Sequence, residues 1–475
     1  MEVTPIGWIL IPLGIALYFF APTRLYPCTI FFLPFSATAV VNIGSAGSAS
    51  GLQATIFFGA LWMATELPRF LAAKNSPTRE SIHVPASQLR WFVLVVMLSL
   101  VMPIWINGRV YIEDAEFANG LSNSEPLVFR IRNISQTIYL VYGILLAVLV
   151  AFRNSHLAEF IRSIRIFLIS AIFVSIWGFL QFFCSVLNIT YPAYVFNTSA
   201  TGSALGYLEE VGDLGIARVS SVATEPSIFA GCMLIALVFA LFAIIRKQPV
   251  ISRNWDRAAV VIIFGALIIS TSTIAYVGLA VVVVLYLSSL QYLKIVRRKH
   301  IIWLLGLVVF FGLAFALFSP AQDIIASFVL GKGESYSGIA RAYAIALAAQ
   351  YFLQYPILGL GWGSVTSHDL VFKLLSNTGL LGFGAFSFFL ISLFRRLWRG
   401  ATRIGVVNPE WQWWSVCLLV AYLVLIFTNV TTGFDFVFEH VWFLLGLSMS
   451  VPILSSTSSL ERRRPHLHGR EAIVT

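Results

Sequence analysis

The chain has 475 residues, of which 59% are hydrophobic and only 11% are charged, and its formal net charge at pH 7 is +10. Soluble domains carry about 25% charged residues, so this composition excludes an ordinary soluble fold and indicates a protein surrounded by membrane lipids. The positive charge does not indicate nucleic-acid binding, because basic residues of membrane proteins gather in cytoplasmic loops for topological reasons. We therefore expect no nucleic acid among the partners.

Apolar stretches long enough to cross a bilayer recur along the whole chain. The thirteen candidate spans lie near residues 6–22, 28–45, 51–68, 90–107, 135–152, 165–187, 227–245, 256–271, 273–290, 301–318, 379–396, 412–431 and 436–454. Residues 256–290 are divided because this stretch is too long for one span and Ser270–Thr273 offers a polar hinge. The sequence predicts an all-α polytopic membrane protein with about thirteen transmembrane helices, within a range of 12–14.

The distribution of charge between the loops predicts the direction of these spans. With the N-terminus outside, 24 of the 31 basic residues fall in inner loops or the C-terminal tail, and about fourteen of the 21 acidic residues fall outside. Merging residues 256–290 into one span would invert this pattern for everything downstream. The positive-inside rule therefore supports the division and places the C-terminus in the cytoplasm.

The chain divides into four regions by span and loop length. N-terminal helices occupy 1–164, a core occupies 165–400, C-terminal helices occupy 401–455, and a basic tail occupies 456–475. The long segments all lie on the predicted outer side, at 108–134, 188–226 and 319–378. Loops held on a rigid scaffold carry most binding and catalytic residues, so we expect the protein to work at its outer face.

Arg218 and Glu225 lie near the end of the second outer segment, in the sequence LGIARVSSVATEPSIFAG. Glu225 precedes a proline and is therefore biased towards an extended conformation. Pro226 and Ser227 suit the first turn of the following helix. Two interpretations stay open here: a helix start with Arg218 as a lipid-headgroup anchor, or a pair of functional residues.

The third outer segment predicts a helix over about 338–353, which ends at Pro356 and the glycine-rich GLGWGS. Arg341 lies in the first turns of this helix, where the helix dipole disfavours a cation. It therefore indicates an anionic partner, with Glu334 or a lipid phosphate as the simplest alternatives. The glycines follow no strand, so a nucleotide-binding loop is excluded, and we expect them to let the backbone pass close to a ligand or another helix.

His368 and Asp369 follow these glycines, just before the span predicted to begin at residue 379. His368 is the only histidine placed in an outer segment. Asp435 and Glu439 are four residues apart, so they share a helix face near the outer end of the last span. They either line the same outer cavity or pair with arginines of the first outer segment.

Two arginines, a carboxylate and a histidine at the outer face suit the transfer of a glycan from a lipid-linked diphosphate. Arginine matches phosphate oxygens bidentately and stays charged. A departing diphosphate needs such stabilisation while its bond to the sugar breaks. The acceptor hydroxyl needs a general base, for which histidine and glutamate are usual. We predict no cofactor and no metal at this site.

Several motifs resemble those of one family. They are His368 followed by Gly379-Leu-Leu-Gly, Arg341 followed by PILGLGWG, Arg218 followed by Glu-Pro-Ser, and the paired helices around Ser270–Thr273. Over residues 165–400 the chain resembles the bacterial O-antigen ligases and polysaccharide polymerases. The resemblance implies an integral-membrane glycosyltransferase of GT-C-like architecture in the bacterial inner (plasma) membrane, with catalysis outside the cytoplasm.

The resemblance also implies roles for the candidate residues. Arg218 and Arg341 would hold the diphosphate, and His368 would orient or deprotonate the acceptor, with Glu225 as a second candidate base. The candidates for supporting roles are Asp369, Asp435 and Glu439. The implied substrate is a polyprenyl-diphosphate-linked oligosaccharide, and the candidate partners are a chain-length regulator and a flippase.

Departures from the family pattern separate the alternatives. Asp369 stands where ligases prefer an amide or serine, Phe383 stands where they place threonine, and the Glu-Pro-Ser segment looks more like the polymerases. The sequence therefore favours a polymerase over a ligase. A transporter of lipid-linked sugars is a further alternative, in which Glu439 and His440 would be the intramembrane ionisable residues. The last alternative is a structural scaffold of a polysaccharide assembly complex.

Overall fold

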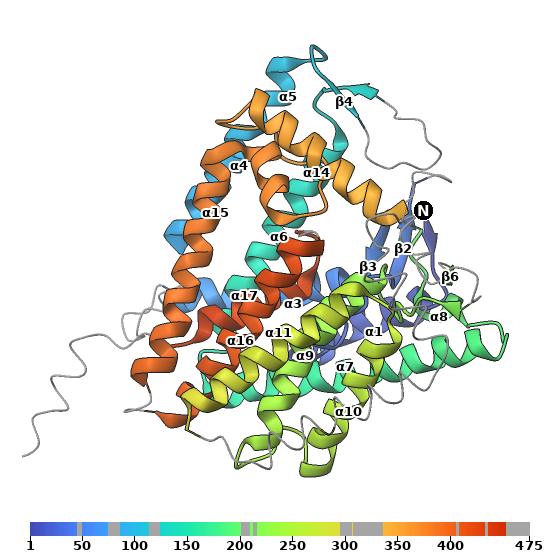
Figure 1. The fold of residues 1–475 in the computed structure, drawn as a ribbon, viewed down its shortest axis with the longest axis vertical. Helices are drawn as coiled ribbons and strands as arrows, with labels where there is room; N and C mark the ends of the chain where they lie inside the picture. The colour runs from blue at the N-terminus through green and yellow to red at the C-terminus, as the bar shows by residue number, and fades with distance from the viewer. Residues whose placement is uncertain are drawn as a thin grey trace, which may run out of the picture.

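The computed structural model describes residues 1–44, 50–74, 86–113, 124–200, 210–211, 216–294, 306, 336–404, 408–432 and 436–452. The structure is 74% helical with few strands, and the helices pack into one bundle with short strands at its edge (Figure 1). Among the described residues, eight helices are long and apolar enough to cross a membrane. The predicted class, a mostly helical membrane protein, is thus confirmed, whereas a count of thirteen spans is not.

Most predicted spans correspond to a helix. The eight long ones are α3 (Ala54–Lys74), α4 (Ala86–Ser99) continued by α5 (Val101–Ile106), α6 (Ile131–Arg153), α7 (Leu157–Val186), α9 (Pro226–Ile245), α11 (Thr273–Tyr292), α15 (Leu370–Arg403) and α16 (Pro409–Thr432). Three shorter helices stand at further predicted spans: α1 (Gly7–Phe20), α10 (Arg253–Ile269) and α17 (Glu439–Ser450). The span predicted at 301–318 lies outside the described residues, apart from residue 306.

The span predicted at 28–45 is wrong. Helix α2 (Leu25–Phe31), which follows a 3₁₀ turn at Pro22–Arg24, ends before Pro34, and the chain continues as strand β2 (Ala39–Ile43). Proline removes a backbone donor and disfavours a helical conformation in the residue before it, and the Ala-Val-Val-Asn-Ile run that follows favours a strand. Strand β2 is the middle of an antiparallel sheet, between β1 (Glu2–Val3) and β3 (Ser50–Gln53).

Helix α9 is the central element of the bundle, with α7, α10, α11 and α16 packed around it. Its sequence is apolar on every side, as expected for a helix surrounded by other helices rather than by solvent. Nearly all of its residues are buried. Because Pro226 begins this helix, the predicted functional residue Glu225 is attached directly to the buried central helix.

The polar hinge predicted within residues 256–290 is confirmed. Helix α10 ends at Ile269 and α11 begins at Thr273, and the three residues between them are buried. Thr271 adopts a positive φ of 48°, a conformation uncommon outside glycine. The chain therefore turns between the two helices.

One end of the bundle carries α5, the hairpin of β4 (Tyr111–Glu113) and β5 (Ser124–Pro126), helix α14 (Tyr336–Gln354) and the loop 355–369, and we call it the hairpin end (Figure 1). The helix predicted over 338–353 is α14. A small hydrophobic cluster joins these elements through Ile106, Leu127, Ala348, Tyr351, Leu360 and Val365. The remaining short elements are α8 (Ala193–Phe196), β6 (Glu210–Val211) and β7 (Ile216–Ala217).

Helix α15 bends at the first glycine of the Gly-Leu-Leu-Gly motif. Gly379 has φ 63° and ψ −166° within the helix, a region occupied essentially by glycine alone. A Cβ there would lie 2.2 Å from the carbonyl carbon and oxygen of Ile357. The predicted span at 379–396 begins at this bend, and the helix itself begins nine residues earlier. The region boundaries after residues 164 and 400 fall inside α7 and α15.

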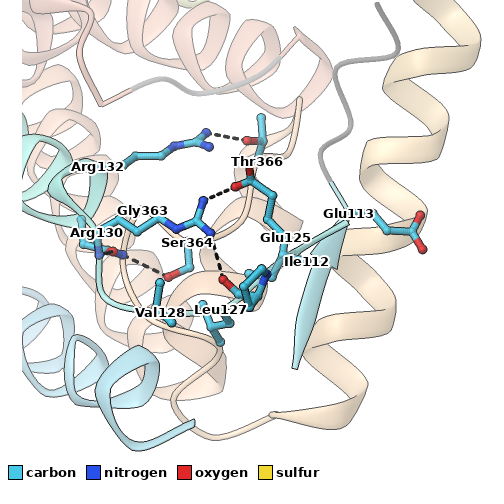
Figure 2. A pocket seen from close by; sticks show the side chains of 12 residues that line it. Ile112, Glu113, Glu125, Leu127, Val128, Arg130, Arg132, Gly363, Ser364 and Thr366 are labelled. Atoms are coloured by element: carbon cyan, nitrogen blue, oxygen red, sulfur yellow. Dashed lines mark hydrogen bonds and ion pairs between the residues drawn. The ribbon is translucent and has the colours of Figure 1, made fainter. Parts of the chain in front are cut away.

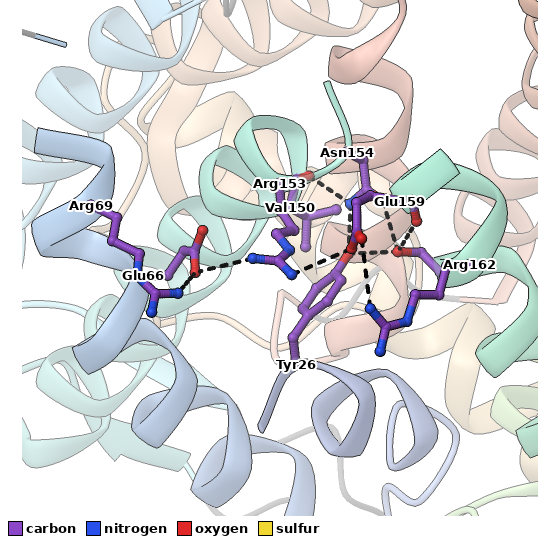
Figure 3. Close-up of polar contacts among 9 residues, drawn as sticks. Tyr26, Glu66, Arg69, Val150, Arg153, Asn154, Glu159 and Arg162 are labelled. Carbon is purple, nitrogen blue, oxygen red and sulfur yellow. Dashed lines mark hydrogen bonds and ion pairs between the residues drawn. The ribbon is translucent and has the colours of Figure 1, made fainter. Parts of the chain in front are cut away.

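A buried polar network joins the start of α2, the C-terminal end of α6 and the first turns of α7 (Figure 3). Asn154 donates to the Tyr26 hydroxyl at 2.5 Å and accepts from Ser163 at 2.7 Å, and Tyr26 and Ser163 lie 3.0 Å apart. Next to this triangle, Arg153 bridges Glu66 and Glu159 at 3.9 and 3.4 Å. We call the three residues of the triangle, Tyr26, Asn154 and Ser163, the Asn154 network.

Candidate functional site

Arg341 and Glu225, predicted independently from two outer segments, form an ion pair. Arg341 Nη2 lies 3.4 Å from Glu225 Oε2, and the two side chains are 21% and 41% exposed. The Ser227 hydroxyl donates to the same carboxylate oxygen at 2.9 Å. Glu225 is extended, with φ −140° and ψ 151°, and Pro226 begins α9 as predicted. The anionic partner expected for Arg341 is therefore Glu225, whereas the alternative Glu334 lies outside the described residues.

Arg218 begins a short non-helical segment that is held inside the bundle. The backbone N–H groups of Ser220 and Ser221 donate to Gln181 Oε1 of α7 at 3.1 and 2.7 Å, and Ser221 Oγ donates to the Val174 carbonyl at 2.7 Å. These bonds replace the helical bonds that the segment lacks. Arg218 itself is half-buried and lies within electrostatic range of the Tyr276 hydroxyl on α11.

His368 and Asp369 lie at the start of α15. Asp369 is buried and caps this helix, because its Oδ2 accepts from the Phe372 N–H at 2.8 Å and its Oδ1 accepts from the Ser367 hydroxyl at 2.6 Å. This capping role accounts for Asp369 without any part in chemistry. His368 is half-buried beside it, on a backbone that the cap fixes.

Of the two carboxylates predicted on the last span, Asp435 lies outside the described residues. Glu439 is 1% exposed in the first turn of α17, and its Oε1 has no hydrogen-bond partner in the described part of the chain. Tyr142 on α6 is the neighbour with which it interacts electrostatically. Glu439 is therefore buried between helices and does not belong to an exposed outer surface.

A small polar pocket at the hairpin end was not predicted from the sequence (Figure 2). Its volume is about 60 Å³, and the hairpin, the start of α6 and the loop 363–366 form its walls. Arg130 pairs with Glu125 and donates to the Pro126 carbonyl at 3.0 Å. Arg132 donates to Thr366 Oγ1 at 2.6 Å. The alternative in which arginines of this segment pair with the last span is wrong for Arg130, whose partner is local.

Two buried amides fix the loop beside this pocket. Asn133 donates to the Trp362 carbonyl at 2.6 Å and to Ser364 Oγ at 3.0 Å. Asn377 Oδ1 accepts from the N–H groups of Ser364 and Val365 at 3.0 Å each. Gly363 has φ +79°, and a Cβ there would lie 3.0 Å from that of Gln136 on α6. The predicted close approach of this glycine-rich backbone to another helix is confirmed.

Polar residues next to apolar spans were the available signal for these anchors. Asn133 and Asn377 each lie two residues before a predicted span, close to the membrane, where an amide has few solvent partners and finds one in the protein. The sequence does not reveal which backbone each amide would hold.

The described residues contain no group of three or more histidine, cysteine, aspartate or glutamate side chains that could hold a metal ion. No protein-family model matches the chain, and no curated protein shows significant sequence similarity to it. Its function is therefore argued from the site.

Proposed function

We propose that the protein polymerises lipid-linked oligosaccharide repeat units into surface polysaccharide, by transferring glycan from a polyprenyl diphosphate at the outer face of the bacterial inner membrane. The observation that supports this most directly is the Arg341–Glu225 pair. It brings a cation suited to phosphate and a candidate base together from two distant segments, with both side chains partly open to solvent.

In the proposed reaction, the diphosphate replaces Glu225 as the partner of Arg341, and Arg218 supplies further positive charge. The acceptor hydroxyl attacks the anomeric carbon of the donor glycan, and the bond between that carbon and the diphosphate oxygen breaks. Its electron pair leaves with the diphosphate, whose charge the arginines stabilise. The hydroxyl proton passes to His368, or to Glu225 once Arg341 has released it.

A ligase would use the same donor and leaving group with a different acceptor, so the two functions differ only in the product. A transporter is favoured by a separate observation, the buried Glu439 Oε1, which has no hydrogen-bond partner among the described residues. Ionisable groups buried between membrane helices commonly mark a transport pathway. The test must therefore separate three outcomes.

The experiment uses purified protein in lipid with a polyprenyl-diphosphate oligosaccharide, and compares wild type with Arg341→Ala, His368→Ala and the exposed control Arg109→Ala. We expect ladders of longer lipid-linked glycan, reduced about 100-fold or more in the first two variants and unchanged in the control. Transfer to lipid A core alone would make the protein a ligase. No glycan product from correctly folded wild type would overturn the enzyme and favour the transporter.

A further inference from the structure

The pocket at the hairpin end has an excess of positive charge. Figure 2 shows the Arg130 guanidinium directed at Glu125, while Arg132 reaches across to Thr366. Arg130 also donates to the Pro126 carbonyl. Glu113, which also lines the pocket, projects away from the other labelled side chains and accepts a hydrogen bond from Tyr343. One carboxylate thus faces two guanidinium groups.

Arg132 is the group left with binding capacity. Within the described residues its guanidinium makes one side-chain hydrogen bond, to the neutral hydroxyl of Thr366, although it carries five N–H donors. It stands in the first turn of α6, where the helix dipole disfavours a cation. An anion in the pocket would accept the remaining donors and offset this unfavourable placement.

The size and lining of the pocket suit a small oxyanion. A cavity holds a water molecule in about 10–15 Å³ of such space, so about 60 Å³ is large enough for one carboxylate. Asn133 and Asn377 hold the wall formed by the loop that carries Ser364. The hydroxyls of Ser364 and Thr366 add donors suited to an oxyanion.

The pocket is also linked to the proposed reaction site through the chain. Thr366 is two residues before His368, and the Asp369 cap fixes the intervening backbone at the start of α15. An oxyanion bound between Arg132 and Thr366 would therefore be fixed relative to the histidine that is proposed to activate the acceptor. A glycan carrying an acidic sugar provides such a group.

We propose that this pocket binds the carboxylate of an acidic sugar in the glycan, with Arg132 as the principal ligand and Ser364 and Thr366 as neutral donors. The inference rests on the proposed function only in taking the anion to belong to a glycan. The same oxyanion chemistry could come from a phospholipid headgroup, and the experiment distinguishes the two sources.

The test measures binding without turnover, so it stands even if wild type forms no polymer. The full chain is placed in phosphatidylcholine nanodiscs and titrated with a glucuronate-containing oligosaccharide or with a neutral glucose oligosaccharide of equal length. We expect Arg132→Gln to weaken binding of the acidic probe about ten-fold, as for a lost charge-assisted hydrogen bond, without changing binding of the neutral one. The matched control Arg109→Gln removes an exposed arginine outside the pocket and should change neither.

Thr366→Val provides a second variant, because it removes the hydroxyl that positions Arg132 but keeps the charge. We expect it to weaken acidic-probe binding less than Arg132→Gln does. Equal affinity of wild type for the two probes would overturn the proposal. So would a result in which Arg132→Gln changes only the binding of phosphatidylglycerol added to the nanodiscs, since the site would then bind a lipid phosphate.

Discussion

In the Asn154 network the polar side chains bond to one another away from solvent, whereas at the hairpin end the charged side chains keep part of their surface open. Asn154 and Ser163 have no exposed surface, and the Ser163 hydroxyl donates to the Asn154 side-chain oxygen. Arg341 and Glu225 are 21% and 41% exposed, and Arg130 and Glu125 are 42% and 56% exposed. Both regions are rich in polar contacts, but only the second can exchange a protein partner for a ligand.

The difference indicates which property, stability or binding, each set of contacts affects. Leaving one partner of a buried hydrogen bond unsatisfied costs roughly 1–3 kcal/mol, so the Asn154 network contributes to stability. Solvent-exposed ion pairs contribute about 0–1 kcal/mol, so the pairs at the hairpin end add little to it. Substitutions should therefore lower the free energy of unfolding in the first region and change binding in the second.

The largest effect that we expect is a loss of stability at Gly379, which lies against the loop 355–369 of the hairpin end. It is an exception to the comparison, which assigns changes in stability to the Asn154 network. Gly379→Ala should lower the free energy of unfolding by about 3 kcal/mol, because its backbone angles exclude a side chain and a Cβ would lie 2.2 Å from the Ile357 backbone. The measurement is thermal unfolding in detergent. Gly384→Ala is the matched control on the same helix, since no atom lies within 4 Å of its Cβ. Equal unfolding temperatures for the two variants would contradict the prediction.

The next largest effect is expected in the Asn154 network. Asn154→Ala removes both the donor to Tyr26 and the acceptor from Ser163, and should lower the free energy of unfolding by about 2 kcal/mol. Arg130→Ala serves as the control, since Arg130 pairs with Glu125 at the hairpin end and the two side chains are 42% and 56% exposed, so it should cost less than about 1 kcal/mol. A variant at Asn154 as stable as the one at Arg130 would remove the distinction between the two regions.

Much of the bundle could be predicted from apolar runs, because a bilayer-length run has few folded alternatives. The prediction failed at 28–45, where Pro34 divides the run and residues 39–43 enter a sheet with β1 and β3. Hydropathy cannot distinguish a short buried strand from part of a helix. The hinge at 270–272 was found because length and charge distribution, two independent constraints, required it.

The candidate site could be predicted only in part. An anionic partner for Arg341 was expected from its place near the start of the predicted helix, but its identity as Glu225 depends on the fold that brings α14 to the start of α9. The pocket was missed because local sequence does not show which loop lies beside Arg132. That information comes from Asn133, which donates to the Trp362 carbonyl far along the chain, and from Asn377, which accepts from the Ser364 N–H thirteen residues earlier.

A smaller effect, on local stability, is expected at the contact between α14 and the hairpin. The Tyr351 hydroxyl accepts from the Glu113 N–H at 2.9 Å. Tyr351→Phe should therefore increase amide hydrogen exchange at Glu113 about five-fold, which corresponds to roughly 1 kcal/mol. Tyr194→Phe, at a side chain 71% exposed, is the control. Unchanged exchange at Glu113 would mean that the hydrophobic cluster alone holds the hairpin.

The smallest effect tests whether the charges at the hairpin end are available to a ligand. Glu225→Gln should change the unfolding temperature little, because its pair with Arg341 is partly exposed. It should strengthen the binding of inorganic pyrophosphate about three-fold, since Arg341 no longer has a competing carboxylate. Binding is measured by calorimetry in detergent at low salt, where exposed charges are least screened.

Ser227→Ala is the matched variant, because it removes the hydrogen bond to Glu225 but keeps the carboxylate charge. It should leave pyrophosphate affinity nearly unchanged. Arg341→Ala should weaken pyrophosphate binding both in the wild-type chain and when it is combined with Glu225→Gln. If Glu225→Gln instead weakens pyrophosphate binding, Glu225 holds Arg341 in position and does not compete with the anion. The ion pair would then be part of the scaffold, as the Asn154 network is, and the partner exchange in the proposed reaction would be wrong.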